Sequence, residues 1–252
     1  MRLNVYLQKA GAGSRREAER LVADGRVTVN GVKALPTTPV EEGDRVSVDG
    51  RPVTPDTKPL PRLFLLHKPI DVLVTHRDHK NRKTIFDLPV LNPPLWPASN
   101  PRVMNVGRLD VNSEGLLLLS SDGPLAQAMM SPETALSRVY RVRVRGELKP
   151  GDIEALALGI TVDGVNYRGA EFVEEYGQDA RANRWYRCVL TEGKNREIRK
   201  LFEHFGCVVN RLVRVQYGPF FLDDLAPGEI TEVPPAKVKA FLDYLAGKGI
   251  QL

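Results

Sequence analysis

A lone acidic residue stands just before an unbroken run of leucines in the segment NVGRLDVNSEGLLLL, residues 105–119. The run at residues 116–119 predicts a short buried strand. Asp110 lies between this strand and an apolar segment that ends near Val106. A charge beside a core strand is costly unless a cation faces it or it takes part in chemistry. Far along the chain, the segment EGKNREIRK at residues 192–200 offers such cations.

The composition is that of a globular protein: 252 residues, 42% hydrophobic and 27% charged. Its longest apolar run is far shorter than the roughly 18 residues of a membrane span, and the N-terminus lacks the apolar core of a secretion signal. We therefore expect a cytoplasmic protein with no membrane contact. Cys188 and Cys207 have no close-spaced cysteine or histidine partners. Buried thiols are expected, rather than a disulfide framework or a zinc site.

The net charge of +5 is unevenly distributed. Residues 181–216 contain nine Lys or Arg against three acids, and residues 62–83 contain six against two. A local excess of this kind is expected of a face that binds phosphate groups. The alternative is a set of ordinary solvated surface residues.

The first fifty residues contain the helix caps, glycine stops and tight turn expected of a small domain. Apolar spacing predicts a helix from Leu3 to Ala10, closed by Gly11. The sequence SRRE at residues 14–17 is a capping box and predicts a second helix to about Asp24, stopped by Gly25. Residues 26–29 alternate as a strand into the tight turn Asn30-Gly31, and residues 45–48 predict its partner.

This order of helix, cap, helix and hairpin resembles an S4 RNA-binding domain. The resemblance is carried by RLNVYL at residues 2–7, SRREA at 14–18 and GRVTVNG at 25–31. It implies that Arg15, Arg16 and Arg20, on the outer face of the second helix, contact RNA. Ordinary surface residues at the start of a helix are the alternative for these arginines.

The remaining chain is organised around many short strands. We predict an S4-like domain at residues 1–50, a proline-rich linker at 51–61, a main domain at 62–235 and a C-terminal helix and tail at 236–252. Strand-like runs are at residues 63–66, 72–74, 140–144, 185–190 and 213–217. Helices are expected at residues 124–130, 152–158, 195–205 and 236–245. This mixture predicts an α+β fold.

Two simpler interpretations of the Asp110 segment need to be weighed. DVNSEG at residues 110–115 matches the start of a calcium loop, but Ser121 stands where that loop needs a glutamate, and a strand follows in place of a helix. We therefore do not expect calcium. Asp110 could also be structural, paired with an arginine only to fix a turn.

Four distant motifs together favour catalysis. They are Lys68-Pro69 after the first predicted strand, GRLD at residues 107–110 continued by SEGLLLL, Tyr140 in RVYRV at 138–142, and the segment at residues 193–200. This set resembles the pseudouridine synthases of the RsuA/RluB type, which carry an N-terminal S4 domain. The resemblance implies a mainly antiparallel mixed sheet with flanking helices for the main domain.

The resemblance extends to a branch of that family. NREIR at residues 195–199 and RLVRVQYG at 211–218 are more similar to the enzymes of large-subunit (23S) ribosomal RNA, with the RluB type nearest. Small-subunit enzymes typically have a Tyr-His-Gln type sequence where Asn195-Arg196-Glu197 stands. A longer, proline-rich stretch at residues 88–101 departs from the family and leaves the RNA target open.

The implied reaction turns a uridine of ribosomal RNA into pseudouridine without any cofactor. Asp110 is then the nucleophile or base, and Arg199 is the cation opposite it that keeps it ionised. Tyr140 stacks on the target uracil. The implied RNA contacts in this domain are Lys68, Arg108, Lys194 and Arg196, and Arg108 could also occupy the space that the flipped base leaves. The partner is a ribosomal RNA stem-loop, bound by a monomer.

Several alternatives remain open from the sequence. Arg199 could be an unpaired residue on a surface helix, Tyr140 a core residue, and Lys68 packing at the end of a strand. A non-catalytic S4-containing RNA-binding or ribosome-assembly factor would use the same basic faces. An enzyme directed at the small subunit would use the same chemistry.

Overall fold

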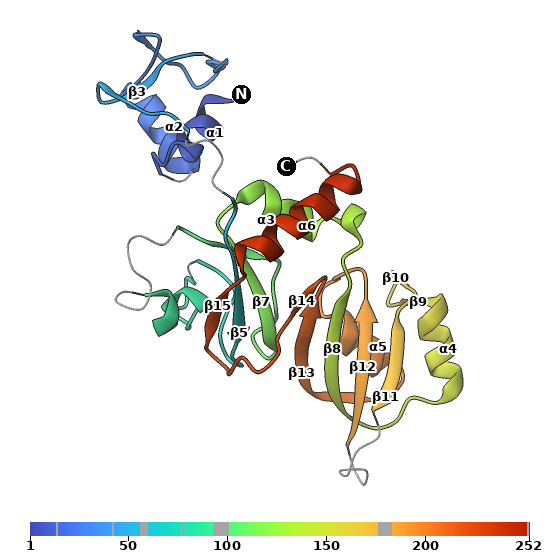
Figure 1. Cartoon of the computed structure of the whole chain (residues 1–252). Helices are drawn as coiled ribbons and strands as arrows, with labels where there is room; N and C mark the ends of the chain where they lie inside the picture. The colour runs from blue at the N-terminus through green and yellow to red at the C-terminus, as the bar shows by residue number, and fades with distance from the viewer. Residues whose placement is uncertain are drawn as a thin grey trace. The chain divides into compact units, whose positions relative to one another are not determined.

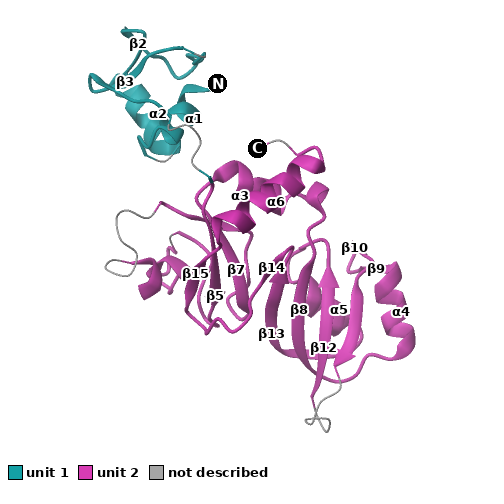
Figure 2. Cartoon of the chain, viewed as in Figure 1, with its two compact units in different colours: residues 1–60 teal, residues 61–252 magenta. Residues whose placement is uncertain are grey.

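The computed structural model describes residues 1–252 apart from 14, 42, 56–59, 77, 93–100, 176–182 and 251. Several predictions fall outside these residues: the serine of the capping box, part of the linker, most of the proline-rich stretch, and Arg77 and Arg181 of the two basic segments. The chain forms two compact units, Met1–Leu60 and Pro61–Leu252 (Figure 2).

The first unit contains two helices and a small antiparallel sheet. The helices are α1 (Leu3–Lys9) and α2 (Arg15–Ala23), and the sheet has the order β2 (Val32–Lys33), β1 (Val27–Val29), β3 (Val46–Val48), β4 (Arg51–Pro52). Asn30 and Gly31 both adopt positive φ, 52° and 81°, as the predicted tight turn between β1 and β2 requires. The range predicted as linker differs in one respect, because β4 at its start pairs with β3.

The second unit is built on one mixed sheet of nine strands. The main order is β11-β12-β8-β13-β7-β5-β15, with β14 beside β13 and β6 beside β7. The strands are β5 (Leu63–Lys68), β6 (Met104–Val106), β7 (Glu114–Ser120), β8 (Arg138–Arg145), β11 (Glu171–Glu175), β12 (Arg184–Leu190), β13 (Val208–Tyr217), β14 (Phe220–Phe221) and β15 (Ile230–Glu232). Among the strands of the described residues, β13 and β7 are the one parallel pair. The predicted α+β class with a mainly antiparallel sheet is confirmed.

Helices cover this sheet, as Figure 1 shows. They are α3 (Gly123–Met130), α4 (Pro150–Leu158), α5 (Glu197–His204) and α6 (Pro235–Gly247). A hairpin of β9 (Gly159–Val162) and β10 (Val165–Arg168) and short 3-10 turns at Ile85–Asp87, Pro89–Leu91 and Pro132–Thr134 complete the unit. The four predicted helices are confirmed within two residues at each end.

The leucine run forms the centre of the sheet. All residues of β7 are buried. Leu116 and Leu118 pack with α3 and α6, whereas Leu117 and Leu119 pack into a separate cluster with Val72 and Ile85. Because side chains of a strand alternate between faces, a strand covered on both faces needs an unbroken apolar run.

One predicted strand is wrong. Residues 72–74 form only an isolated bridge, from Leu73 to Thr84. Val72 and Val74 are buried, so their apolar character reflects core packing and not a sheet ladder. The short strands β9, β10, β11, β14 and β15 were not predicted, since two to five residues carry little pattern of their own.

Two compositional expectations can also be compared with the structure. Cys188 and Cys207 are both buried free thiols, as predicted. Among the described residues, no helix combines the length and apolar character needed to cross a membrane.

Candidate active site

Asp110 lies in the turn that joins β6 to β7. The Ser113 amide donates to the Asp110 carbonyl at 3.1 Å, which closes the turn. Leu109, the preceding residue, is buried among core side chains. The Asp110 side chain is 34% exposed. An apolar anchor followed by an acid in a tight turn therefore leaves a carboxylate open to solvent at the start of the most buried strand.

Lys68, at the end of β5, stabilises this turn through hydrogen bonds to backbone carbonyls. Its side chain is fully buried, and its Nζ donates to the carbonyls of Pro69 at 2.8 Å and Ser113 at 2.7 Å. A longer contact of 3.4 Å reaches the carbonyl of Val111. The ammonium group therefore ties β5 to the Asp110 turn on the neighbouring strand.

Burial lowers the pKa of Lys68 to about 8, although nearby carboxylates, Asp110 first among them, favour its charged form. The sequence analysis left Lys68 open between a phosphate contact and packing at the end of a strand. A fully buried ammonium group with backbone partners cannot reach RNA in this structure. The structure thus favours packing at the end of the strand for Lys68, and its contact with RNA stays a prediction.

Arg196, the residue just before α5, and Arg199 of α5 approach the same turn. Arg196 Nη1 lies 3.9 Å from Asp110 Oδ2, which makes it the ion-pair partner of Asp110. Arg199 donates instead to the carbonyls of Asn112 at 2.8 Å and Val209 at 3.1 Å. The prediction that Arg199 faces Asp110 is thus modified, because Arg196 pairs with the carboxylate directly and Arg199 holds the turn and β13 together.

The electrostatics of Arg199 agree with this arrangement. Burial and the neighbouring Arg196 lower the pKa of Arg199, whereas the charge of Asp110 acts in the opposite direction. Arg196 is more exposed, with 46% of its side chain accessible. Buried Ile198, Leu201 and Phe202 fix α5 against the core. Arg199 and the adjoining Arg196 are therefore held at the start of an anchored helix.

A row of paired residues crosses the sheet beside the turn. Gly115 of β7 pairs with Lys68 of β5 on one side and with Arg214 of β13 on the other. Arg214 in turn pairs with Tyr140 of β8. Because neighbouring strands lie about 4.7–4.9 Å apart, Tyr140 is about 10 Å from the backbone of Gly115. The sheet thus brings Tyr140, distant in sequence, near the Asp110 turn.

Tyr140 is half-buried and packs against two core clusters. The structure therefore includes the core packing that the sequence analysis gave as an alternative, and it leaves part of the ring accessible. Arg108, two residues before Asp110, is exposed.

Arg214 is a residue whose place the sequence analysis missed. It is 2% exposed, and its Nε donates to the carbonyl of Leu116 at 2.7 Å. Its guanidinium also lies over the ring of Tyr217, 5.1 Å from the centroid. It was counted only as part of a basic segment, although its place among apolar residues of a strand could have indicated burial.

Comparison with known proteins decides the family. Residues 62–204 match the RNA pseudouridylate synthase family, and residues 1–46 match the S4 domain. A Rickettsia felis protein described as an uncharacterized RNA pseudouridine synthase is 40% identical over 236 residues, which cover 92% of this chain and 96% of that protein. The chain belongs to the RNA pseudouridine synthase family. The predicted family and enzyme class are confirmed.

Further relatives agree. The ribosomal large subunit pseudouridine synthase B of Pseudomonas aeruginosa is 37% identical across all of this chain, which spans 64% of that protein. A crystal structure titled pseudouridylate synthase covers 95% of this synthase and 98% of its own chain, with a TM-score of 0.63 and 22% identity. That likeness shows that the two share a fold.

Many arginines of the two basic segments form ion pairs with glutamates of the same domain. The acids that pair with these arginines come from other parts of the chain, so a local count does not reveal them. The pairs of known separation are Arg184 with Glu147 (2.8 Å) and Glu174 (2.5 Å), Arg187 with Glu171 (2.7 Å), Arg211 with Glu114 (2.5 Å) and Arg62 with Glu232 (2.5 Å). Among their described residues, the two basic segments therefore do not form continuous phosphate-binding faces, which modifies the interpretation of their charge.

Lys194 of the synthase is also engaged within the protein. Its Nζ donates to Glu192 and to the carbonyl of Asn166, both at 2.6 Å, and lies 5.4 Å from the centroid of the Tyr167 ring. A phosphate contact would have to replace these partners. In this structure Lys194 therefore stabilises the protein, and its contact with RNA stays a prediction.

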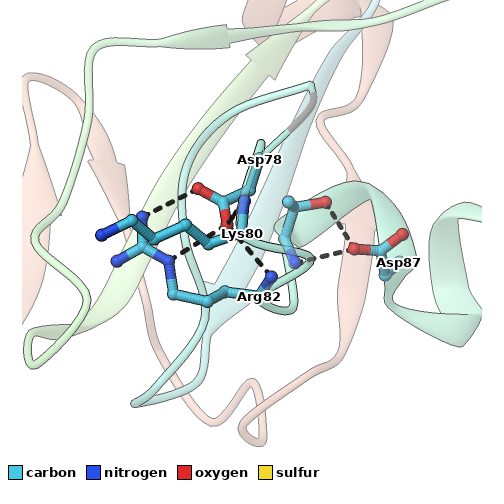
Figure 3. Close-up of polar contacts among 5 residues, drawn as sticks. Asp78, Lys80, Arg82 and Asp87 are labelled. Carbon is cyan, nitrogen blue, oxygen red and sulfur yellow. Dashed lines mark hydrogen bonds and ion pairs between the residues drawn. The ribbon is translucent and has the colours of Figure 1, made fainter.

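A loop after residues 72–74 is organised around one carboxylate (Figure 3). Asp78 accepts from the amides of Lys80 at 3.0 Å and Arg82 at 3.1 Å, and from the Arg82 guanidinium at 2.8 Å. These contacts, with the Arg82 side chain foremost, hold the pKa of Asp78 well below its usual range. Asp87 likewise accepts from the amide and hydroxyl of Thr84, both at 2.8 Å. The sequence analysis did not identify this loop.

The S4 unit presents its predicted arginines on α2. Arg15, Arg16 and Arg20 are all exposed. Arg15 lies 3.5 Å from Glu19, and both side chains of that pair are more than half exposed. An exposed ion pair contributes about 0.2–1 kcal/mol, so a phosphate group could readily take the place of Glu19.

Proposed function

We propose that this enzyme isomerises a uridine of large-subunit (23S) ribosomal RNA and that Asp110 is its catalytic carboxylate. The observation that supports Asp110 best is its setting: a partly exposed carboxylate, paired with Arg196, in a turn that Lys68 and Arg199 fix through backbone carbonyls. The Pseudomonas aeruginosa relative, named for the large ribosomal subunit, supports the target.

The chemistry needs such a group. The bond from base N1 to the anomeric carbon of the ribose breaks, the base turns, and C5 forms a bond to the same carbon. Positive character develops at the anomeric carbon as the first bond breaks, and an ionised carboxylate is suited to meet it. Asp110 can act on the sugar or on the base, and Arg196 lies 3.9 Å from its carboxylate in either case.

The RNA must deliver its base to this carboxylate. We propose a stem-loop substrate whose target uridine is flipped out, since the reacting atoms are otherwise enclosed in the stack. Tyr140 would stack on the uracil through the exposed part of its ring, worth about 1–3 kcal/mol by analogy with other single-stranded sites. Arg108 would contact the backbone or fill the vacated space.

The S4 unit would supply a second contact. Arg15, Arg16 and Arg20 would bind phosphate groups of the same RNA through charge. We further propose that the enzyme acts as a monomer in the cytoplasm, where ribosome biogenesis supplies its substrate.

The test of Asp110 is release of tritium from ribosomal RNA labelled at uridine C5, because only formation of the new bond at C5 liberates that label. We expect the intact protein to release tritium and Asp110→Asn to lower the rate by about 10²–10⁴-fold or more. RNA binding, measured by filter retention, should be retained. Full activity of Asp110→Asn would remove the proposed mechanism.

Mapping of pseudouridine in ribosomal RNA from cells with and without the protein tests the target. Loss of a site in 23S RNA supports the proposal. Loss confined to 16S RNA would favour the small-subunit alternative, and no loss at all would favour a binding protein.

A further inference from the structure

The helix that follows Arg196 begins with a buried acid. Glu197 is the first residue of α5 and is only 4% exposed. Its Oε2 accepts from the Lys194 amide at 2.8 Å, and its own amide donates to the Lys194 carbonyl at 3.2 Å. These two hydrogen bonds close the turn at residues 194–197 from its inner side.

The other carboxylate oxygen of Glu197 faces a second acid. Oε1 is buried and has no donor among the described residues, but the Glu192 carboxyl group lies within hydrogen-bonding reach. A buried and a half-buried carboxyl group within hydrogen-bonding reach of each other are most stable when they share a proton. Burial, followed by the proximity of Glu192, raises the pKa of Glu197 to about 7.

Glu192 is held in turn by three neighbours. It accepts from the Arg168 amide of β10 at 2.8 Å and from Lys194 Nζ at 2.6 Å. Burial acts to raise the pKa of Glu192, but these hydrogen bonds and the one with Glu197 outweigh it and lower that pKa. The pair therefore connects the start of α5 to the β9–β10 hairpin.

The turn that this pair closes includes Arg196 in an unfavourable backbone conformation. Arg196 has a φ of 52°, in the left-handed region that residues other than glycine rarely adopt. Such a conformation persists only where surrounding contacts fix it. The closing contacts here are those of Glu197, on the residue next in sequence.

We infer that Glu197 is a positioning residue, which keeps Arg196 opposite Asp110 by closing the 194–197 turn around a carboxyl pair with Glu192. This inference rests on the proposed role of Asp110. It assigns a task in the reaction to an acid that is buried and touches no substrate.

Single-turnover tritium release and RNA affinity test the inference in the full-length protein. Misplacement of a catalytic contact by about 1 Å can lower a rate by about 10²-fold, so we expect Glu197→Ala to reduce the rate of turnover by about 10–100-fold with little change in affinity. Glu197→Gln should restore most of the rate, because an amide can accept from Lys194 and donate to Glu192. Glu203→Ala, an exposed acid on the same helix, is the matched control and should behave as the parent does.

A double-mutant cycle with Arg196→Ala tests whether Glu197 acts through Arg196. If Glu197 acts through Arg196, then Glu197→Ala should have little further effect in the Arg196→Ala background. Independent, multiplying losses would overturn the inference, as would full activity of Glu197→Ala beside an inactive Asp110→Asn. Failure of the Asp110 proposal is seen separately, in an active Asp110→Asn.

Circular dichroism and thermal melting establish that each variant is folded. Should Glu197→Ala not fold, Glu192→Ala takes its place in the same cycle, because it removes the partner of the pair from a half-buried position. A partial loss of rate that disappears in the Arg196→Ala background supports the inference. An unchanged rate for Glu192→Ala, or an inactive but folded Glu197→Gln, contradicts it.

Discussion

Lys68 shows how one buried charge can organise a site that it never enters. A buried ammonium group is costly, and the cost is offset here by the carbonyls of Pro69 and Ser113 and by the negative charge of Asp110. The same contacts fix the turn in front of the leucine strand. The hydrogen bonds that stabilise the buried Lys68 therefore also hold the backbone turn that positions Asp110.

We predict that Lys68→Met lowers the free energy of unfolding by about 1–3 kcal/mol at pH 7, since the variant leaves buried carbonyls without a donor. Tritium release should fall as the Asp110 turn loosens. Denaturant melts measure the first effect. Lys239→Met, an exposed lysine on α6, should leave both quantities unchanged. Equal stability of Lys68→Met and its parent would contradict the structural role of Lys68.

The change of stability with pH follows from the pKa of Lys68, which burial lowers from 10.5 to about 8. Between these values the unfolded chain holds a proton that the folded protein has lost, so the stability that Lys68 contributes rises with pH. The parent should gain up to about 3 kcal/mol over Lys68→Met between pH 8 and 10.5. A constant difference across this range would show that the pKa is not shifted.

Residue types and motifs predicted which side chains gather at the site better than they predicted how these pair. Asp110, Tyr140, Arg196 and Arg199 were all selected from the sequence. The pairing of Arg196, rather than Arg199, with Asp110 could not be predicted, because it depends on the left-handed conformation of Arg196 just before α5. The burial of Lys68 likewise depends on strand pairing, which a single sequence does not specify.

At the scale of elements, the parallel contact of β7 with β13 brings two backbones close together at Gly115. Gly115 has a φ of 103°, and a Cβ atom placed on it would overlap the backbone of Arg214. The parallel pair that joins the two halves of the sheet therefore requires glycine at this position.

We predict that Gly115→Ala lowers the free energy of unfolding by about 3 kcal/mol or more, from strain and overlap together. Gly228→Ala is the matched control, because Gly228 has a similar φ of 88° but open space around it. It should cost only about 1–2 kcal/mol. Urea unfolding of both variants gives the comparison. Similar losses in the two would mean that the overlap with Arg214 is relieved at little cost.

Among elements, periodicity predicted the long ones and missed the short ones. The leucine strand and the helices were recognised because many residues repeat one pattern. The strand β15 has three residues and depends on pairing with β5, more than 160 positions earlier in the chain, and local sequence carries no record of that partner. Residues 72–74 failed for the opposite reason, since burial in a core can produce a strand-like pattern without a ladder.

At the scale of the whole molecule, two units each present their own basic residues. In the S4 unit these are the exposed arginines of α2, and in the larger unit Arg108 and Arg196 flank Asp110. Affinity for RNA should therefore be divided between the units, and the S4 unit should contribute the part that depends most on salt.

We predict that Arg15→Ala with Arg16→Ala weakens RNA binding and reduces the slope of log affinity against log salt by about 1 for each lost phosphate contact. Filter binding over a range of salt concentrations measures the slope. Lys33→Ala with Arg51→Ala removes the same charge from the exposed sheet of the same unit and should leave the slope unchanged. The reverse result would place the RNA on the sheet instead of α2.

The cross-strand ion pairs on the sheet have a consequence for selectivity. RNA is attracted to any positive surface charge that is not neutralised by a nearby acid. An enzyme whose surface arginines were all unpaired would therefore bind RNA nonspecifically. Here Arg187 and Arg211 are each matched by a glutamate from a neighbouring strand. These two arginines should therefore attract RNA less strongly than unpaired arginines would, and we expect nonspecific binding of RNA at their positions to be weak.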